Sequence, residues 1–232
     1  ATASTDGTSI GTAGCYQATF GGGTADVFLV EFNSTGQRNW GTYYGGPGSL
    51  SDDGIWNTYD SNGDIYLTGL TNSTANIASP GAHQTSPGGT SDGFISKFNA
   101  SGQLLWGTYY GGTGTDYFYG GCLDASGNVY ASGITSTTLT GIIATPGAHQ
   151  QVYGGSNDAM VVKFNSSGTR LWGTYYGGAG HDLAGRPAVD VNGDLYFSGM
   201  TASSSGTVIA TACAYQSNYG GGTYDAYLTK FS

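Results

Sequence analysis

The amino-acid sequence predicts an all-β protein made of tandem, four-stranded antiparallel blades of the β-propeller type. The segment Trp-Gly-Thr-Tyr-Tyr-Gly-Gly recurs every 66 residues, at 40–46, 106–112 and 172–178. A phrase that begins with aspartate and ends with phenylalanine recurs at 26–32, 92–98, 158–164 and 225–231. A third phrase, from aspartate to tyrosine, recurs at 60–66, 124–130 and 190–196. Self-similarity at such a period is the signature of a repeat architecture.

The repeats divide a single domain, residues 1–232, into about three and a half units. A half unit covers residues 1–32, and repeats follow at about 33–98, 99–164 and 165–231. The chain therefore begins and ends on the same half of the unit.

Strands within a unit follow from alternation and turn residues, as the second copy shows. A β-rich run at 93–98 leads through a glycine-containing turn, 99–102, into a partner strand at 103–110. A strand at 117–123, the turn 124–127 and a strand at 128–134 come next. We expect two hairpins in one antiparallel sheet, then a link of about twenty residues rich in Ser, Thr, Gly and Pro. Four-stranded units are typical of propeller blades. A β-solenoid is the alternative, although its coils are usually shorter.

Composition narrows the class of protein and of partner. Forty-three glycines with only 5 prolines and 13% aromatic residues exclude collagen and argue against disorder. Only 9% of residues are charged, and the net charge is −9, so nucleic acid and anionic membrane surfaces are poor matches. No apolar stretch is long enough to span a bilayer, so we expect no membrane insertion. The chain starts Ala-Thr-Ala rather than with Met, which suggests a processed product. We expect a secreted protein, extracellular or on the cell surface.

The three phrases together resemble a known repeat. The string D-x-F-[LIV]-x-K-F-N-x-S-G-x-x-x-W-x-T-Y-x-G-G, then D-x-x-G-[ND]-[VIL]-Y-x-[ST]-G, then T-P-G-A-x-Q, is similar to the bacterial SBBP β-propeller repeat. The resemblance covers essentially the whole chain. It implies blades in a secreted or surface-attached protein and supplies no catalytic residues. The chain departs from the family in having too few units for the usual ring.

The two ends of the array predict an assembly edge. Propellers close with about four to eight blades, so three and a half units do not close comfortably. Both ends carry the same apolar strand, and exposed strand edges recruit other strands. We expect another copy to complete the array head to tail, giving an oligomer or a filament. The edge residues are Val27, Phe28, Leu29, Val30, Glu31, Phe32, Ala226, Tyr227, Leu228, Thr229, Lys230 and Phe231.

Charge and cysteine also differ at the two ends. Glu31 stands where the later copies have lysine, so a contact between Glu31 and Lys230 could join two ends. Cys15 and Cys213 lie in equivalent segments of the first and last copies, which makes them disulfide candidates within one ring or between chains. Two unrelated small buried thiols are the alternative. Cys122 is expected to be a buried small residue.

Repeated aspartates are the candidates for chemistry. Asp52, Asp116 and Asp182 recur before one strand, and Asp60, Asp124 and Asp190 recur after it. Residues repeated in every unit are typical of turn hydrogen bonds, whereas a hydrolase needs one asymmetric carboxylate site. The segments 60–64 and 190–194 resemble calcium loops without the terminal Glu of an EF-hand, so weak calcium binding stays open. We expect no cofactor, metal site or catalytic residue, and hence no enzyme.

Repeated aromatic residues suggest a second function. One shallow sugar site per blade would make the protein a multivalent carbohydrate-binding lectin with glycans as partners. Packing between blades is the alternative role for the same residues. The residues are Trp40, Tyr44, Trp106, Tyr110, Trp172 and Tyr176. The favoured function is a non-enzymatic structural or adhesive protein that self-assembles, and the lectin is the alternative.

Overall fold

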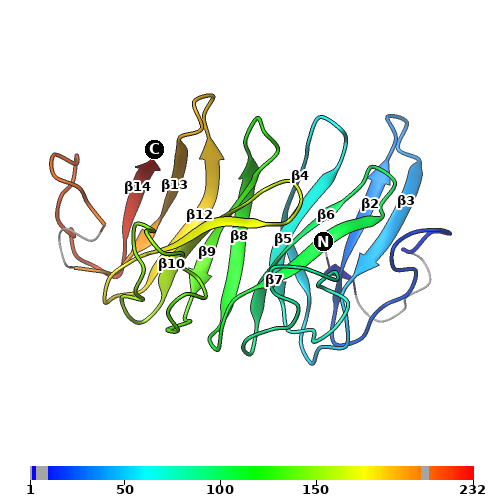
Figure 1. Ribbon diagram of the computed structural model, residues 1–232, viewed down its shortest axis with the longest axis horizontal. Helices are drawn as coiled ribbons and strands as arrows, with labels where there is room; N and C mark the ends of the chain where they lie inside the picture. The colour runs from blue at the N-terminus through cyan, green and yellow to red at the C-terminus, as the bar shows by residue number, and fades with distance from the viewer. Residues whose placement is uncertain (1, 4–9, 205–208) are drawn as a thin grey trace.

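The computed structural model describes residues 2–3, 10–204 and 209–232, and these residues form an all-β array of antiparallel sheets. Figure 1 shows the sheets side by side in chain order, from the blue N-terminal sheet to the red C-terminal sheet. No helix in this described part is long and apolar enough to cross a membrane. The prediction of repeated four-stranded blades is confirmed.

Two complete blades occupy the middle of the array. The second blade runs in the order β4 (Asp53–Tyr59), β5 (Ile65–Thr71), β6 (Asp92–Phe98), β7 (Leu104–Tyr110). The third blade repeats this order with β8 (Asp116–Leu123), β9 (Val129–Thr135), β10 (Asp158–Phe164), β11 (Arg170–Tyr176). Every neighbouring pair is antiparallel.

The terminal blades are incomplete among the described residues. The first contains β1 (Thr2–Ala3), β2 (Asp26–Phe32) and β3 (Arg38–Tyr44), and the fourth contains β12 (Asp182–Val189), β13 (Leu195–Thr201) and β14 (Asp225–Phe231). By sequence, β2 and β3 match the third and fourth strands of a complete blade, whereas β12 to β14 match the first three. Within the described residues, no fourth strand pairs with β14, and β2 pairs with the two-residue β1 on the side away from β3.

The grouping of strands differs from the expected one. The strands of the second copy lie within a residue or two of their predicted positions, but 92–98 and 104–110 form one sheet with 53–71, not with 116–135. The long link, residues 72–91, therefore lies inside a blade, between its second and third strands. The boundaries of the predicted repeats therefore differ from the boundaries of the blades by half a unit. The reason is that the short link after β7 leads into the next sheet, whereas the sequence analysis placed both hairpins in the same sheet.

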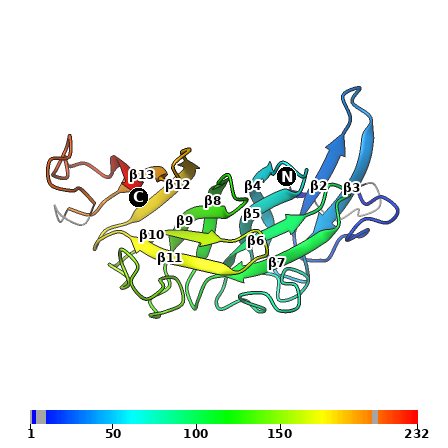
Figure 2. The same cartoon turned by 45° about the horizontal axis from the view of Figure 1, so that its top comes forward.

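Neighbouring blades are joined by a repeated contact. Isolated parallel bridges connect Ala25 with Ser51, Ser91 with Thr115, and Asn157 with His181. The first strands β8 and β12 also contact each other, and hydrophobic clusters fill the space between successive blades. Figure 2 shows the resulting open row, with the β2–β3 hairpin at one end and β13 and β14 at the other.

Candidate assembly site

A glutamine in the long link holds the fourth strand of each complete blade. In the third blade the backbone N–H of Gln150 donates to Thr174 Oγ1 (2.9 Å), and its carbonyl accepts from the N–H of Tyr175 (3.1 Å). Gln150 Oε1 accepts from the N–H of Gly177 (2.9 Å), while Nε2 donates to Asp158 Oδ2 (2.9 Å). One residue thus ties the link to the third and fourth strands. The sequence showed the repeated glutamine, but only the fold reveals what it binds.

The same arrangement recurs in the first two blades. Gln17 and Gln84 take the place of Gln150, and their fourth strands are β3 and β7. The backbone N–H groups of Gln17 and Gln84 donate to Thr42 Oγ1 and Thr108 Oγ1, at 2.9 Å each. Their Oε1 atoms accept from the backbone N–H groups of Gly45 (3.2 Å) and Gly111 (3.1 Å).

The fourth blade has this glutamine, but the described residues contain no strand for it to hold. Gln216 Nε2 donates to Asp225 Oδ2 (2.9 Å) and to the carbonyl of Asn218 (3.0 Å), as its counterparts do. Within the described residues, nothing occupies the position beside β14 that β11 fills in the third blade. A cavity of about 500 Å³ lies there instead, lined by β14 and by residues of 209–219. The predicted C-terminal edge is therefore an open groove.

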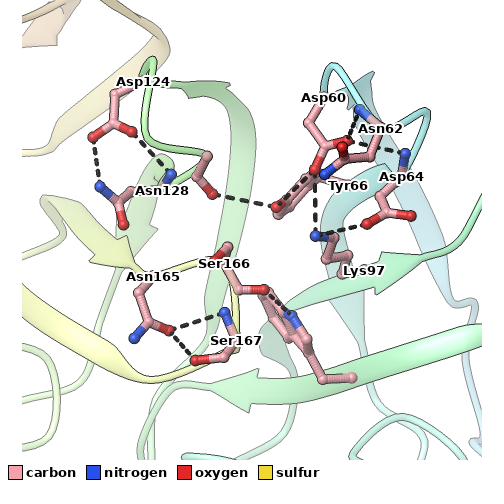
Figure 3. A network of polar contacts seen from close by, with 12 residues as sticks. Asp60, Asn62, Asp64, Tyr66, Lys97, Asp124, Asn128, Asn165, Ser166 and Ser167 are labelled. Carbon is pink, nitrogen blue, oxygen red and sulfur yellow. Dashed lines mark hydrogen bonds and ion pairs between the residues drawn. The ribbon is translucent and has the colours of Figure 1, made fainter.

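A second hollow lies over Trp172. In the preceding blades a turn of the next blade covers the equivalent tryptophan, with Trp40 Nε1 donating to Ala100 O and Trp106 Nε1 donating to Ser166 O, both at 3.0 Å. Figure 3 shows Ser166, whose carbonyl accepts the second of these bonds. No such turn follows β14 in the described chain, and a cavity of about 540 Å³ lies beside Trp172.

The face of β14 is also uncovered. Leu228 is 77% exposed, whereas its counterparts Ile95 and Val161 are fully buried against the blade that follows each of them. Of the predicted edge residues on β2, Val27 and Leu29 are buried against the second blade and Phe32 is exposed. The N-terminal edge strand thus has a covered face, and the C-terminal edge strand has an open one.

The repeated lysine serves its own blade. Lys97 Nζ lies 2.9 Å from Asp64 Oδ2 and 3.3 Å from Asp60 Oδ2, over the ring of Tyr66 (Figure 3). Lys163 binds Asp124 (3.1 Å) in the same way. Lys230 lies 2.6 Å from Asp194 Oδ2, an ion pair within the fourth blade. A contact between Lys230 and Glu31 of another copy stays a prediction.

The turn aspartates are held by hydrogen bonds. Asp60 Oδ1 accepts from the backbone N–H groups of Asn62 (2.9 Å) and Asp64 (3.1 Å). Burial acts to raise the pKa of Asp60, but these bonds and Lys97 outweigh it and lower the pKa. Across the described residues, no group of three or more His, Cys, Asp or Glu side chains is arranged to hold a metal ion.

A buried carboxyl pair occupies each junction between blades. Both Asp158 and Asp182 are fully buried, and a Cβ at Gly177 would lie 2.8 Å from Asp158 Oδ1 and 2.7 Å from Asp182 Oδ2. Asp158 Oδ1 has no hydrogen-bond partner, whereas Asp182 Oδ2 accepts from Ser203 Oγ and Gly178 N (2.7 Å each). Burial, with the charge of Asp182, raises the pKa of Asp158 to about 7.

These pairs combine two carboxyls in different environments, as acid–base catalysis requires. All six aspartates of these pairs are at most 1% exposed, and none of them lines a described cavity. They are Asp26, Asp52, Asp92, Asp116, Asp158 and Asp182. Their repetition at each junction, beside a glycine that leaves no room for a side chain, fits a structural contact between blades.

The repeated aromatics pack between blades. Tyr44, Tyr110 and Tyr176 are buried, and their hydroxyls donate to the carbonyls of Ile77, Ile143 and Ile209 in the following blade, each at 2.6 Å. Trp106 is 9% exposed, and Trp40 and Trp172 are half-buried. The tyrosine rings therefore offer no open face to a sugar.

The three cysteines are free in this structure. Cys15 lies in the first blade and Cys213 in the fourth, so no intrachain bond joins them in this conformation. Cys122 is half-buried, and burial raises the pKa of its thiol to about 12. Cys213 has a φ of 67° at the position where Gly147 has 80°.

No family model matches this chain, and no curated protein matches it. Membership of the SBBP repeat family stays a prediction that rests on the three recurring phrases.

Proposed function

We propose that this chain is a non-enzymatic structural or adhesive protein that associates head to tail through its incomplete terminal blades. The open place beside β14 carries the proposal, because the link around it has the same form as in the complete blades. β14 itself contains no proline, and its one lysine is paired with Asp194. Such an edge lacks the usual devices that prevent strand addition.

Strand counting indicates how copies could join. Each chain holds two complete blades, three strands of a fourth and the last two long strands of a first. Where two copies meet, β12 to β14 of one copy and β2 and β3 of the other can form one four-stranded blade. Five strands meet there, and two of them, β14 and β2, are candidates for the third place. Two copies would close into six blades, within the range of about four to eight found in propellers. A junction of another rotation would propagate as a filament.

The charge at residue 31 of β2, compared with that at residue 230 of β14, indicates which of these two strands takes the third place in the joined blade. If β2 of a second copy replaced β14, Glu31 would take the place of Lys230 and face Asp194. Like charges at that distance repel, whereas Lys230 is attracted. We therefore assign the third place to β14 and the fourth to β3 of the second copy.

The amino-acid composition supports a proposal for where the protein acts and which partners it has. A charged fraction of 9% and a net charge of −9 support a secreted or cell-surface setting and disfavour nucleic-acid partners. The glycan-binding alternative has no structural observation in its favour, since the tyrosines expected to bind sugar are buried.

Light scattering across a concentration series, with and without reductant, tests the proposal. We expect masses that are multiples of 23.7 kDa, with a ring giving twice that value and a filament giving a growing series. If the mass falls when reductant is added, the result would indicate that a disulfide between Cys213 of one copy and Cys15 of another also holds the copies together. A strictly monomeric chain in both conditions contradicts the proposal.

A matched pair of variants locates the interface. Leu228→Lys places a charge on the open face of β14 and should weaken association. Leu105→Lys, at a position 48% exposed on β7 of the second blade, should leave it unchanged.

A further inference from the structure

We infer that the groove beside β14 is a binding site for one extended polypeptide segment with the sequence pattern of this chain's fourth strands, Trp-Gly-Thr-Tyr-Tyr-Gly-Gly. The inference rests on the proposed function and names the chemistry of the strand that the groove accepts. Three separate parts of the groove match parts of that segment.

The first part is the backbone of the link. Gln150 offers the fourth strand an N–H, a carbonyl and Oε1, which meet Thr174, Tyr175 and Gly177. Gln216 offers the same three groups in the groove, with its side chain already held by Asp225. Because the Gln216 side chain is held before any strand is present, binding requires little reorganisation at this residue, which favours affinity.

The second part recognises the first tyrosine of the pattern. Tyr109 OH donates to Ser73 O (2.8 Å), and Tyr175 OH donates to Thr137 O (2.9 Å), in each case near the end of the blade's second strand. Ser203 is the equivalent residue of the fourth blade, and it lines the groove. The groove is therefore shaped for a tyrosine at this position, where its hydroxyl finds an acceptor.

The third part is the hollow over Trp172. A turn of sequence Asn-x-Ser-Gly precedes each of the inner fourth strands, and its backbone accepts from the tryptophan of the blade before. A segment that carries this turn would cover Trp172 and fill the second cavity. The best match is a segment with the sequence of residues 165–178, which contains both the turn and the strand.

Register with β14 follows from the third blade. There Ala159 lies opposite Tyr176, Val161 opposite Thr174, and Lys163 opposite Trp172. The bound segment should therefore place its second tyrosine opposite Ala226 and its tryptophan opposite Lys230, antiparallel to β14.

A labelled synthetic peptide with the sequence of residues 165–178 tests the inference against the full chain by fluorescence anisotropy. We expect saturable binding of one peptide per chain, and no binding of a scrambled peptide. Hydrogen exchange should show increased protection at 211–216 and 225–231. Protection confined to 27–32, or binding of the scrambled peptide with equal affinity, would overturn the inference.

Matched changes on both partners sharpen the test. Gln216→Ala should weaken peptide binding about fivefold to tenfold, as expected for a lost hydrogen bond of about 1 kcal/mol. Gln150→Ala, the same change beside an occupied strand, should leave peptide affinity unchanged below its melting temperature. Within the peptide, the change Tyr175→Ala should weaken binding at least tenfold. Equal affinities for both glutamine variants would contradict the assigned groove.

The outcome separates this inference from self-assembly. Peptide binding by a chain that remains monomeric supports the groove and contradicts head-to-tail association. Association of the chain without specific peptide binding supports assembly and overturns the groove as the site of strand recognition.

Discussion

At the scale of single residues, the buried carboxyl pairs are the feature least visible in the sequence. Asp26, Asp92 and Asp158 begin the third strand of their blades. Each meets an aspartate at the start of the next blade, namely Asp52 directly before β4, Asp116 as the first residue of β8, or Asp182 as the first residue of β12. The repeated phrases showed both sets of aspartates, but not that they converge. Their meeting point depends on the parallel bridge between blades and on the glycine after the tyrosine pair, which are properties of the assembled fold.

Protonation of these pairs should make stability depend on pH. Burial raises the pKa of Asp26 and Asp92 to about 6 and that of Asp158 to about 7, above the value of about 3.9 for an unfolded chain. Between about pH 4 and pH 7 the native state thus binds more protons than the unfolded state, so stability falls as pH rises through this window.

Thermal unfolding at several pH values checks this prediction. We expect a higher melting temperature at pH 5 than at pH 8, with Asp158→Asn reducing the difference because the amide stays neutral. Asp60 and Asp124 have lowered pKa values and act oppositely, so stability should be lost again below about pH 4. A melting temperature that rises steadily from pH 5 to pH 8 would contradict the assignment.

Cys213 should be a strained position. Its φ of 67° lies in the left-handed region, which costs a residue with a Cβ about 1–2 kcal/mol, whereas the equivalent Gly14, Gly81 and Gly147 adopt it freely. Cys213→Gly should therefore raise the free energy of unfolding by about 0.5–1 kcal/mol in urea titration under reducing conditions. Cys213→Ala is the control, since it removes the thiol and keeps the strain. Equal stability of the two variants would show that φ is not the cause.

At the scale of elements, the lysine on the third strand fastens that strand to the hairpin formed by the first two. Lys97 has a side chain 8% exposed and binds Asp60 and Asp64, whereas Lys230 is 46% exposed. Removing a buried partner leaves an unpaired buried charge, while an exposed pair contributes little.

The two lysines should therefore respond differently to the same substitution. We expect Lys97→Met to lower the free energy of unfolding by about 2–3 kcal/mol, and Lys230→Met to lower it much less because its ion pair is exposed. Chemical denaturation of both variants provides the measurement. A loss at Lys230 as large as that at Lys97 would mean that burial does not set the strength of this contact.

Strand positions could be predicted from the sequence because alternation and turn residues are local signals. The predicted strands at 93–98 and 128–134 differ from β6 and β9 by about one residue. Which hairpins share a sheet depends on contacts between residues far apart in the sequence. The equal spacing of the repeats is compatible with pairing of each hairpin with the hairpin before it or with the hairpin after it. The groove at Gln216 was hidden for the same reason, since its function depends on the strand that Gln17, Gln84 and Gln150 hold elsewhere.

At the scale of the whole molecule, Glu31 should distinguish two forms of the proposed association. Replacement of β14 by β2 of another copy should be disfavoured in the wild-type chain, because Glu31 would face Asp194. Glu31→Lys removes this repulsion and permits exchange of the whole β2–β3 hairpin. We expect about tenfold stronger association in sedimentation equilibrium, which corresponds to about 1.4 kcal/mol.

A neutral variant provides the comparison. Glu31→Gln removes the repulsion without adding the attraction, so its association constant should lie between those of the wild type and Glu31→Lys. Identical constants for all three chains would mean that residue 31 lies away from the junction.

The half-unit offset between repeat and blade has a consequence for how such arrays change in length. A gain of one 66-residue period adds four strands, and a loss of one period removes four strands, wherever the period begins. Each long link that remains still carries its glutamine. Unequal recombination within a gene of this kind would thus change the number of blades and keep the same types of strand at both ends of the array. The surfaces that we propose to join copies would then stay the same while the array changes in length.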